Sequence, residues 1–283
     1  MASPTISRAP SAGRAPGRAK TVAAALCLLT LSFGALVVTV SYLLDAREGQ
    51  RVDQAAMDAV YARRDALDQL LSVLGYLSIG TMATAIVVLV SMAALRQRFA
   101  AAVGAVAVVA AANITTQVLK RVVLDRPDHG YGWHVNSLPS GHTTAAVSLV
   151  VAALLVAPLA LRGLVVLVGT GAIVLTGVST VVAGWHRPSD VLAALAVGLF
   201  WGAAVVLVLA LRRAGPSSGT TVGSLFFALV GAAVAGAVLL GLGVRPYGGW
   251  SGVAPAALVM ALIGVATALS IAVFARISSV FAR

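Results

Sequence analysis

Long apolar runs recur along the whole chain, and they restrict the fold more than any other feature of the sequence. A bilayer core about 30 Å thick is crossed by roughly 20 apolar residues in a helix. Such runs are predicted at 21–44, 71–95, 99–118, 143–161, 163–184, 190–211, 223–244 and 253–275. Because backbone groups in lipid must be paired within their own segment, these runs predict helices. We therefore expect an all-α, polytopic membrane helical bundle.

The placement of charge predicts how this bundle is oriented. Only 10% of the residues are charged, and the net charge is +11. With the N-terminus inside, the cytoplasmic segments carry no acidic residue. Their basic residues are Arg8, Arg14, Arg18, Lys20, Arg96, Arg98, Arg162, Arg212, Arg213, Arg276 and Arg283. The remaining charges balance on the other face, as the positive-inside rule expects. The excess of positive charge therefore indicates that the chain lies in a bilayer and does not bind a nucleic acid. It also predicts that both termini are cytoplasmic.

Two polar segments flank the first run. Residues 1–20 are rich in Ala, Pro, Ser, Gly and Arg, which is typical of a disordered tail. Residues 45–70 are rich in acidic side chains, and Val52, Ala56 and Val60 recur there at helical spacing. We interpret this second segment as a solvated connecting helix outside the membrane.

The segment 136–146, NSLPSGHTTAA, lies between two apolar runs and is a candidate anion site. Its turn opens into an apolar helix, so we expect unpaired backbone N–H groups at Ser140, Gly141 and His142. A histidine beside a bound anion can donate a proton to a leaving group. The alternative is a turn that only caps the helix.

Basic residues precede this turn. Pro127 holds Arg126 in an extended conformation, so Lys120 and Arg126 could reach one anion from two sides. Interfacial snorkelling is the alternative for such a cluster. The span before it turns polar near its end, at Asn113, Thr115, Thr116 and Gln117, which predicts either interhelical hydrogen bonds or the lining of a headgroup pocket.

The segment 184–190, GWHRPSD, places Asp190 four residues after His186. A carboxylate at this spacing can bind one imidazole nitrogen and leave the other free as a nucleophile. The alternative is an aspartate that caps the helix beginning near Pro188. Asp190 is the only acidic residue beside either motif histidine, and the single cysteine is Cys27 in the first run, so we expect no metal site.

Together these stretches resemble the type 2 phosphatidic acid phosphatase (PAP2) family of integral membrane lipid phosphatases. Pro-Ser-Gly-His is intact at 139–142, and His-x-x-x-Asp is intact at His186 and Asp190. The resemblance covers 21–212, which implies a six-helix core with the site at its outer ends. Residues 213–283 then add two further transmembrane helices.

The chain departs from the family pattern twice. Five residues separate Lys120 from Arg126, one fewer than in the family. Thr180 follows Ser179 where the family has a phosphate-binding arginine. We expect Arg187, or else Arg121, to supply the missing guanidinium.

The resemblance implies a mechanism without metal or cofactor. His186 attacks phosphorus, Asp190 orients it, and His142 protonates the leaving oxygen. Lys120, Arg126, Ser140 and Gly141 bind the phosphate oxygens. The implied substrate is a lipid phosphate or diphosphate, of the polyprenyl diphosphate or phosphatidic acid type, reached at the extracytoplasmic face of a bacterial plasma membrane. A lipid-phosphate transferase and a non-catalytic lipid-phosphate-binding scaffold are the alternatives.

Overall fold

The structure, a computed structural model, describes residues 16–62, 64–75, 79–133, 135–212 and 221–281. The predicted tail falls almost entirely outside the described residues. The longer helices are α1 (Pro16–Val38), α2 (Arg47–Asp58), α3 (Arg64–Gly75), α4 (Ile79–Leu95), α5 (Phe99–Val118), α6 (Gly141–Val156), α7 (Leu159–Val182), α8 (Pro188–Arg212), α9 (Thr221–Leu242) and α10 (Val253–Ser278). Two π-helices, η1 (Thr39–Leu44) and η2 (Leu119–Val123), extend α1 and α5, while η3 (Gly249–Gly252) and η4 (Ser279–Phe281) are short 3-10 helices.

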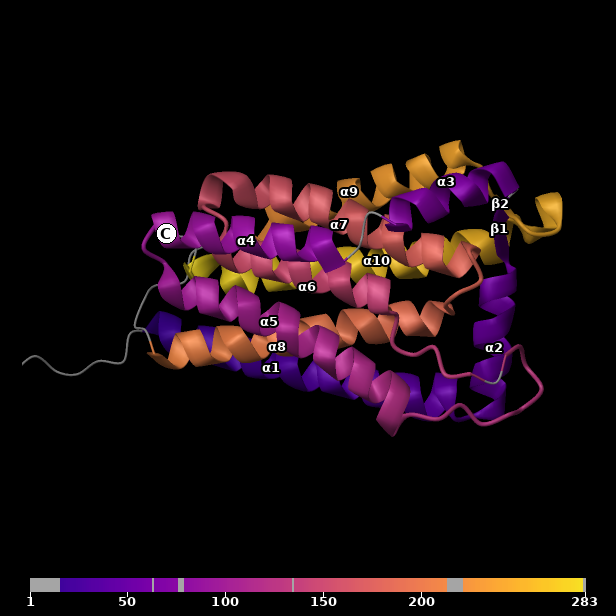
Figure 1. The fold of residues 1–283 in the computed structure, drawn as a ribbon, viewed down its shortest axis with the longest axis horizontal. Helices are drawn as coiled ribbons and strands as arrows, with labels where there is room; N and C mark the ends of the chain where they lie inside the picture. The colour runs from indigo at the N-terminus through magenta and orange to yellow at the C-terminus, as the bar shows by residue number, and fades with distance from the viewer. Residues whose placement is uncertain (1–15, 63, 76–78, 134, 213–220, 282–283) are drawn as a thin grey trace, which may run out of the picture.

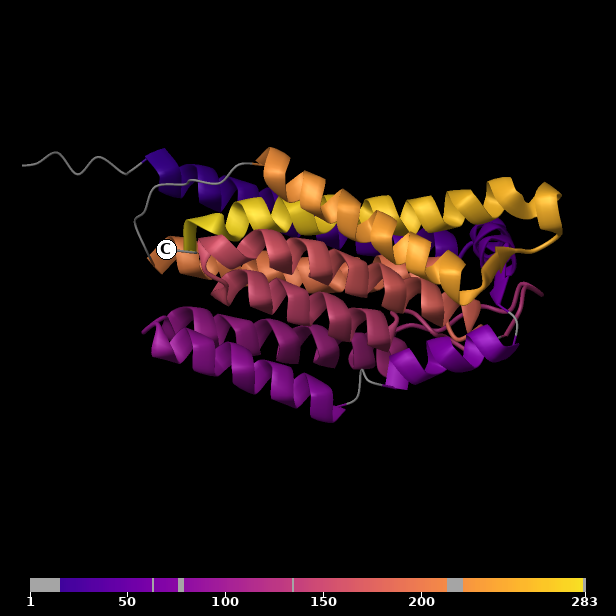
Figure 2. The same ribbon diagram turned by 90° about the horizontal axis from the view of Figure 1, so that it is seen from above.

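The long helices run side by side, so the predicted all-α polytopic bundle is confirmed (Figure 1). Figure 2 shows α4 and α5 on one side of the bundle and α9 and α10 on the opposite side, with α6, α7 and α8 between them. Six segments among the described residues are long and apolar enough to cross a membrane, namely 17–44, 99–123, 159–182, 188–212, 223–242 and 249–281. Two of the predicted spans are shorter apolar helices, at 80–95 and 141–156.

The predicted span 71–95 is wrong at its start. Residues up to Gly75 belong to α3, and α4 begins only at Ile79. Helix α3 carries polar side chains, among them Asp68 and Gln69, and it packs against α7 and α9 instead of continuing the line of α4. Figure 1 shows the two helices as separate pieces.

Helix α6 lies in the interior of the bundle and is correspondingly short. Its 16 residues extend about 24 Å, less than the hydrocarbon core. Most of its side chains are buried by α5, α7 and α8. Close approach depends on Gly198 of α8, where a Cβ atom would stand 2.3 Å from Val147 Cγ1. Because protein and not lipid surrounds α6, it does not have to match the thickness of the bilayer.

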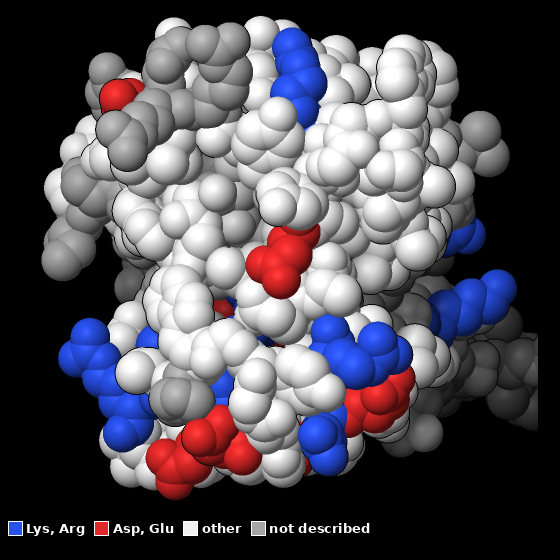
Figure 3. Space-filling model, turned by 90° about the vertical axis from the view of Figure 1, so that its right-hand side faces the viewer, with Lys and Arg blue, Asp and Glu red and all other residues white. Residues whose placement is uncertain are grey.

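The two ends of the bundle differ. Both described chain ends, Pro16 and Phe281, lie at one end (Figure 1). The opposite end, which we call the polar end, is formed by α2, by loop residues 124–133 and 135–140, and by the loop 183–187. Figure 3 shows charged side chains gathered over the lower half of this face, with further charged atoms visible through small openings. The candidate site lies beneath this surface.

A two-stranded sheet connects α2 to the last two helices. Strand β1 (Val60–Ala62) pairs antiparallel with β2 (Val244–Pro246), with Tyr61 opposite Arg245. The N–H of Tyr247 also donates to the carbonyl of Ala59 at 2.9 Å. Since β2 lies between α9 and α10, the C-terminal pair of helices anchors the segment that follows α2.

Candidate active site

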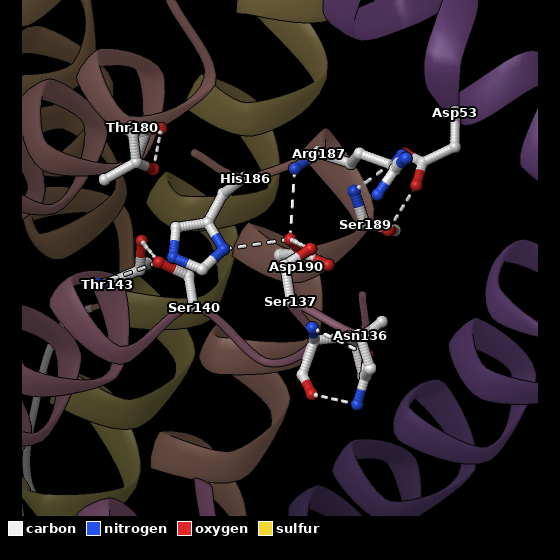
Figure 4. Close-up of polar contacts among 12 residues, drawn as sticks. Asp53, Asn136, Ser137, Ser140, Thr143, Thr180, His186, Arg187, Ser189 and Asp190 are labelled. Carbon is white, nitrogen blue, oxygen red and sulfur yellow. Dashed lines mark hydrogen bonds and ion pairs between the residues drawn. The ribbon is translucent and has the colours of Figure 1, made fainter. Parts of the chain in front are cut away.

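His186 and Asp190 form a buried pair at the polar end. His186 Nδ1 and Asp190 Oδ2 are 2.9 Å apart, His186 is 8% exposed, and Asp190 is completely buried. The bond occupies Nδ1, so Nε2 is the ring nitrogen left for chemistry. In the view of Figure 4, the ring lies between Asp190 on one side and the turn of Ser140 and Thr143 on the other.

Asp190 combines the two roles that the sequence left open. Its Oδ2 also accepts from the backbone N–H of Arg187 at 3.1 Å and from Ser137 Oγ at 2.6 Å. The bond from the Arg187 N–H, just before the first residue of α8, corresponds to one of the two bonds of a capping box. The carboxylate that caps α8 is therefore also the group that orients His186. Asp190 Oδ1 is buried without a partner among the described residues.

The turn before α6 is held by Ser140, which is the N-cap of that helix. Its Oγ accepts from the N–H of Thr143 at 3.3 Å and from Thr143 Oγ1 at 3.0 Å. The expectation of an unpaired N–H at Ser140 is wrong, because this group donates to the carbonyl of Asp190 at 3.0 Å. Gly141 and His142, as the first residues of α6, have no intrahelical acceptor for their N–H groups. The Ser140 bond instead fixes the turn against α8.

His142 and Lys120 approach the His186 pair from two other elements. The ring of His142 packs on Trp185, with 5.6 Å between centroids, and Lys120 and His186 are near enough to interact with it electrostatically. Lys120 is half-buried in η2, and its charge also interacts with Asp190. The π-helical turn thus lies in the segment where the spacing from Lys120 to Arg126 departs from the family pattern.

Arg126 is the most unusual cation of the site. Its residue exposure is 7%, and none of its three guanidinium nitrogens has a hydrogen-bond partner among the described residues. Burial, and then the charge of Arg187, lower the pKa of Arg126. A buried guanidinium with unused donors is costly unless it binds something. This arrangement is suited to an anion with several oxygens.

Helix α2 contributes residues that sequence reasoning missed. Asp53 accepts from the N–H of Ser189 at 3.0 Å and from Ser189 Oγ at 2.5 Å, and it lies 4.0 Å from Arg126 Nη2 (Figure 4). Gln54 Oε1 accepts from Arg187 Nε at 3.1 Å. The interpretation of α2 as a solvated connector is therefore wrong. Its buried face is polar, whereas Val52 of the expected apolar stripe is 44% exposed.

Burial also changes the acidity of Asp53. Desolvation, opposed by the hydrogen bonds from Ser189, raises the pKa of Asp53 to about 6. The neighbouring negative charge of Asp190 acts in the same direction as burial, and Arg126 acts against it. The Asp53 carboxyl therefore titrates near neutral pH.

The structure does not place a second arginine beside Thr180. Arg187 is buried, but its guanidinium donates to Gln54 and, at 3.4 Å each, to the carbonyls of Tyr131 and Trp133. Arg121 is exposed on η2. Thr180 itself is buried, with Oγ1 bonded to the carbonyl of Gly177. These bonds direct the Arg187 guanidinium to α2 and the loop. That Arg187 supplies the missing guanidinium stays a prediction.

The polar residues near the end of α5 mostly join helices. Asn113 Nδ2 donates to Ser148 Oγ at 3.1 Å, and Thr116 pairs with Thr144 at 2.9 Å. Gln117 is exposed, and its Nε2 lies 3.8 Å from the position that a Cβ atom of Gly141 would take. Interhelical hydrogen bonding therefore explains Asn113 and Thr116, while Gln117 lies beside the turn before α6.

The site thus brings together two histidines, one carboxylate that orients a histidine, and cations that face inward. This set can bind a phosphate group, attack it with nitrogen and protonate a leaving oxygen. Within the described ranges, no three His, Cys, Asp or Glu side chains are grouped to hold a metal ion.

Comparison with known proteins agrees with this geometry. Residues 101–214 match the family model of the PAP2 superfamily. No curated protein and no solved structure gives a significant match to the chain. The matched segment runs from α5 through α8 and contains Lys120, Arg126, His142, His186 and Asp190. Through this segment the chain is similar to the PAP2 superfamily.

Proposed function

We propose that this protein is a membrane-embedded, metal-independent phosphatase that hydrolyses lipid phosphates or diphosphates through a phosphohistidine on His186. The match of residues 101–214 to the PAP2 superfamily supports phosphatase activity on phosphate esters. The observation that carries the finer proposal is the buried His186–Asp190 pair, which leaves Nε2 free, next to the unpaired guanidinium of Arg126.

The reaction proceeds in two displacements. His186 Nε2 attacks phosphorus, and the bond from phosphorus to the leaving oxygen breaks. That oxygen is the lipid oxygen of a monophosphate or the bridging oxygen of a diphosphate, and His142 gives its proton to it. Water then attacks the phosphorus of the phosphohistidine, and His142 takes a proton from this water. The bond from phosphorus to Nε2 breaks, so inorganic phosphate leaves and the imidazole of His186 is restored. Asp190 holds Nδ1–H throughout, which fixes the tautomer and stabilises the positive charge that develops on the ring.

The phosphate oxygens are held by the cations and by the turn before α6. Arg126 offers a planar set of donors that matches phosphate geometry. Lys120 adds a point charge, and the N–H groups of Gly141 and His142 face the anion at the start of a helix. Ser140 Oγ accepts two hydrogen bonds and retains its own proton as a donor.

A lipid is the proposed substrate because the site lies at the end of apolar helices. Several of these helices are long enough to cross a bilayer, so a headgroup at the membrane surface would be level with the polar end. The charge distribution favours an extracytoplasmic position for this end in a bacterial plasma membrane. Labelling of a Trp133→Cys variant in intact cells by an impermeant thiol reagent tests this orientation, and absence of labelling contradicts it.

The function is tested with purified protein in detergent, phosphatidic acid or a polyprenyl diphosphate as substrate, and excess chelator. The wild type should release inorganic phosphate as fast as substrate is lost. His186→Ala should abolish turnover, and His142→Ala should lower it about 10²–10⁴-fold, the range for general acid catalysis. His129→Ala is the matched control, because the His129 ring is bonded to the carbonyl of Asp45 and has no role in the proposed reaction.

Three outcomes contradict the proposal. Full activity of His186→Ala excludes the nucleophile. Turnover that stalls until an alcohol acceptor is added indicates a transferase. Binding of lipid phosphate without any turnover indicates a non-catalytic scaffold, an outcome that the threonine at 180 keeps open.

A further inference from the structure

We propose that Asp53 of α2 is a positioning residue of the phosphate site, which holds the start of α8 and the Arg126 guanidinium in place and leaves the Arg126 donors free for the anion. This inference rests on the phosphate-binding role proposed above for Arg126. Asp53 lies outside the segment that matches the PAP2 superfamily, so the family match does not assign it a role.

The first support is the attachment of Asp53 to α8. Both of its carboxylate oxygens accept hydrogen bonds from Ser189, one from the backbone N–H and one from the hydroxyl. The N–H groups in the first turn of a helix have no intrahelical acceptor, and a carboxylate there is favourable. Since Ser189 immediately precedes Asp190, this attachment also fixes the residue that orients His186.

The second support is the relation of Asp53 to Arg126. The closest approach is 4.0 Å, from Asp53 Oδ2 to Arg126 Nη2, which is too long for a hydrogen bond. The carboxylate therefore balances the charge of a buried guanidinium without accepting its protons. All three nitrogens of Arg126 remain buried, without a hydrogen-bond partner among the described residues. A ligand with oxygen acceptors can take these donors while the bonds from Asp53 to Ser189 stay intact.

The third support is the face that α2 turns toward the site. Asp53 and Gln54 lie three and four residues after Gln50, and each of the three binds an element of the site. Gln50 Nε2 donates to the carbonyl of Pro127 at 2.9 Å, next to Arg126. Gln54 holds Arg187. Gly132 has a φ of +69°, and a Cβ atom there would meet Gln54 Oε1 at 2.4 Å, so the loop closes tightly on α2.

The test measures binding of inorganic phosphate and turnover for the wild type, Asp53→Asn and Arg126→Ala. Asp53→Asn should weaken phosphate binding about tenfold or more, because the Arg126 guanidinium is then no longer placed for its charged hydrogen bond to phosphate. It should raise KM more than it lowers kcat. Arg126→Ala should remove most of the binding. Glu48→Gln is the matched control, since Glu48 lies on the same helix and pairs with exposed Arg51.

A pH series separates this role from a purely structural one. Asp53 is faced by Arg126 from the loop before α6, by Asp190 from α8 and, through Gln54, by Arg187. Because burial raises the pKa of Asp53 to about 6, its carboxyl is uncharged at lower pH and resembles the amide of the variant. The ratio of wild-type to Asp53→Asn phosphate affinity should be largest above pH 7 and approach one near pH 5.

The outcomes distinguish this inference from the proposed function. Unchanged phosphate binding in Asp53→Asn overturns it, and so does tighter binding, which would mean that Asp53 competes with the anion for Arg126. A pH-independent affinity ratio also overturns it. If the wild type binds phosphate but never releases it from a lipid, the phosphatase proposal fails, and the binding data still decide the role of Asp53. If Arg126→Ala binds phosphate as tightly as the wild type does, both the phosphate-binding role of Arg126 and the positioning role of Asp53 are overturned.

Discussion

At the scale of single residues, two buried carboxylates organise the site, one through a contact that is local in the sequence and one through a contact that is distant. Asp190 binds His186 across four residues, and this bond could be predicted because both residues belong to one local segment. Asp53 binds Ser189 across 136 residues, and no local pattern indicates that contact. The unpaired donors of Arg126 were equally beyond prediction, since they depend on what α2 and α8 leave open.

Asp53 should make stability depend on pH. Its pKa is raised from 3.8 to about 6 in the folded protein, so folding favours the protonated carboxyl. The stabilisation is fully present below pH 3.8 and is lost as the pH rises through 6, with a size of about 3 kcal/mol. The Tm of the wild type should therefore fall relative to that of Asp53→Asn as the pH rises from 3.8 to about 6, and the difference should be constant at higher pH. Parallel Tm curves for the two proteins would contradict this assignment.

At the scale of elements, the direction that a helix faces was harder to predict than its existence. The spacing of Val52, Ala56 and Val60 predicted a helix, but α2 ends at Asp58 and Val60 belongs to β1. Val60 is buried and Ala56 packs beside it, whereas Val52 is exposed. The spacing did not indicate that the polar face is buried as well. The polar face is buried because it meets cations and an open helix terminus, and neither is visible in local periodicity. In the same way, Arg98 was counted as a loop charge, yet it donates to the carbonyls of Leu155 and Val156 at the end of α6.

The placement of α2 should be sensitive to Gly49. A Cβ atom there would lie 1.7 Å from the carbonyl oxygen of Tyr42, and backbone cannot rotate away as a side chain would. Gly49→Ala should therefore displace α2, with a cost of about 1–3 kcal/mol in stability, and should lower phosphate turnover together with phosphate affinity. Thermal unfolding and phosphate release on the same preparation measure both effects.

Gly34→Ala on α1 is the control for this substitution, because nothing lies within 4 Å of its added Cβ atom. It should be neutral or stabilising by about 0.5–1 kcal/mol, the preference of helices for alanine. Equal behaviour of the two variants would show that α2 tolerates movement and would contradict its role in holding the site.

At the scale of the whole molecule, the apolar runs and their lengths were sufficient to predict a helical membrane bundle. They could not predict that α6 is short, since its burial depends on neighbours, nor that β1 pairs with β2. Three-residue strands so far apart in sequence carry no periodic signal. The pairing provides a structural role for the last two helices, which hold the segment that follows α2.

The pairing can be tested by cross-linking. In a Cys27→Ala background, Tyr61→Cys and Arg245→Cys should form a disulfide on oxidation, because directly opposed residues have Cβ atoms about 4.5–5.5 Å apart. Each single-cysteine variant serves as the control, and peptide masses identify the cross-link. Failure to cross-link would contradict the register, since a slip of one residue turns the side chains to opposite faces.

The central claim is that His186 carries the phosphoryl group, and trapping of the enzyme intermediate tests it most directly. His142→Ala is mixed with a lipid phosphate labelled with ³²P, quenched within one turnover, and digested for peptide mapping. Loss of His142 slows both displacements, and the phosphoenzyme that forms lacks the base that activates water. Acid-labile and alkali-stable label should therefore be found on the peptide that contains His186. Label on another residue, or turnover by His142→Ala at the wild-type rate with no labelled protein at any quench time, would contradict the role of His186 as nucleophile.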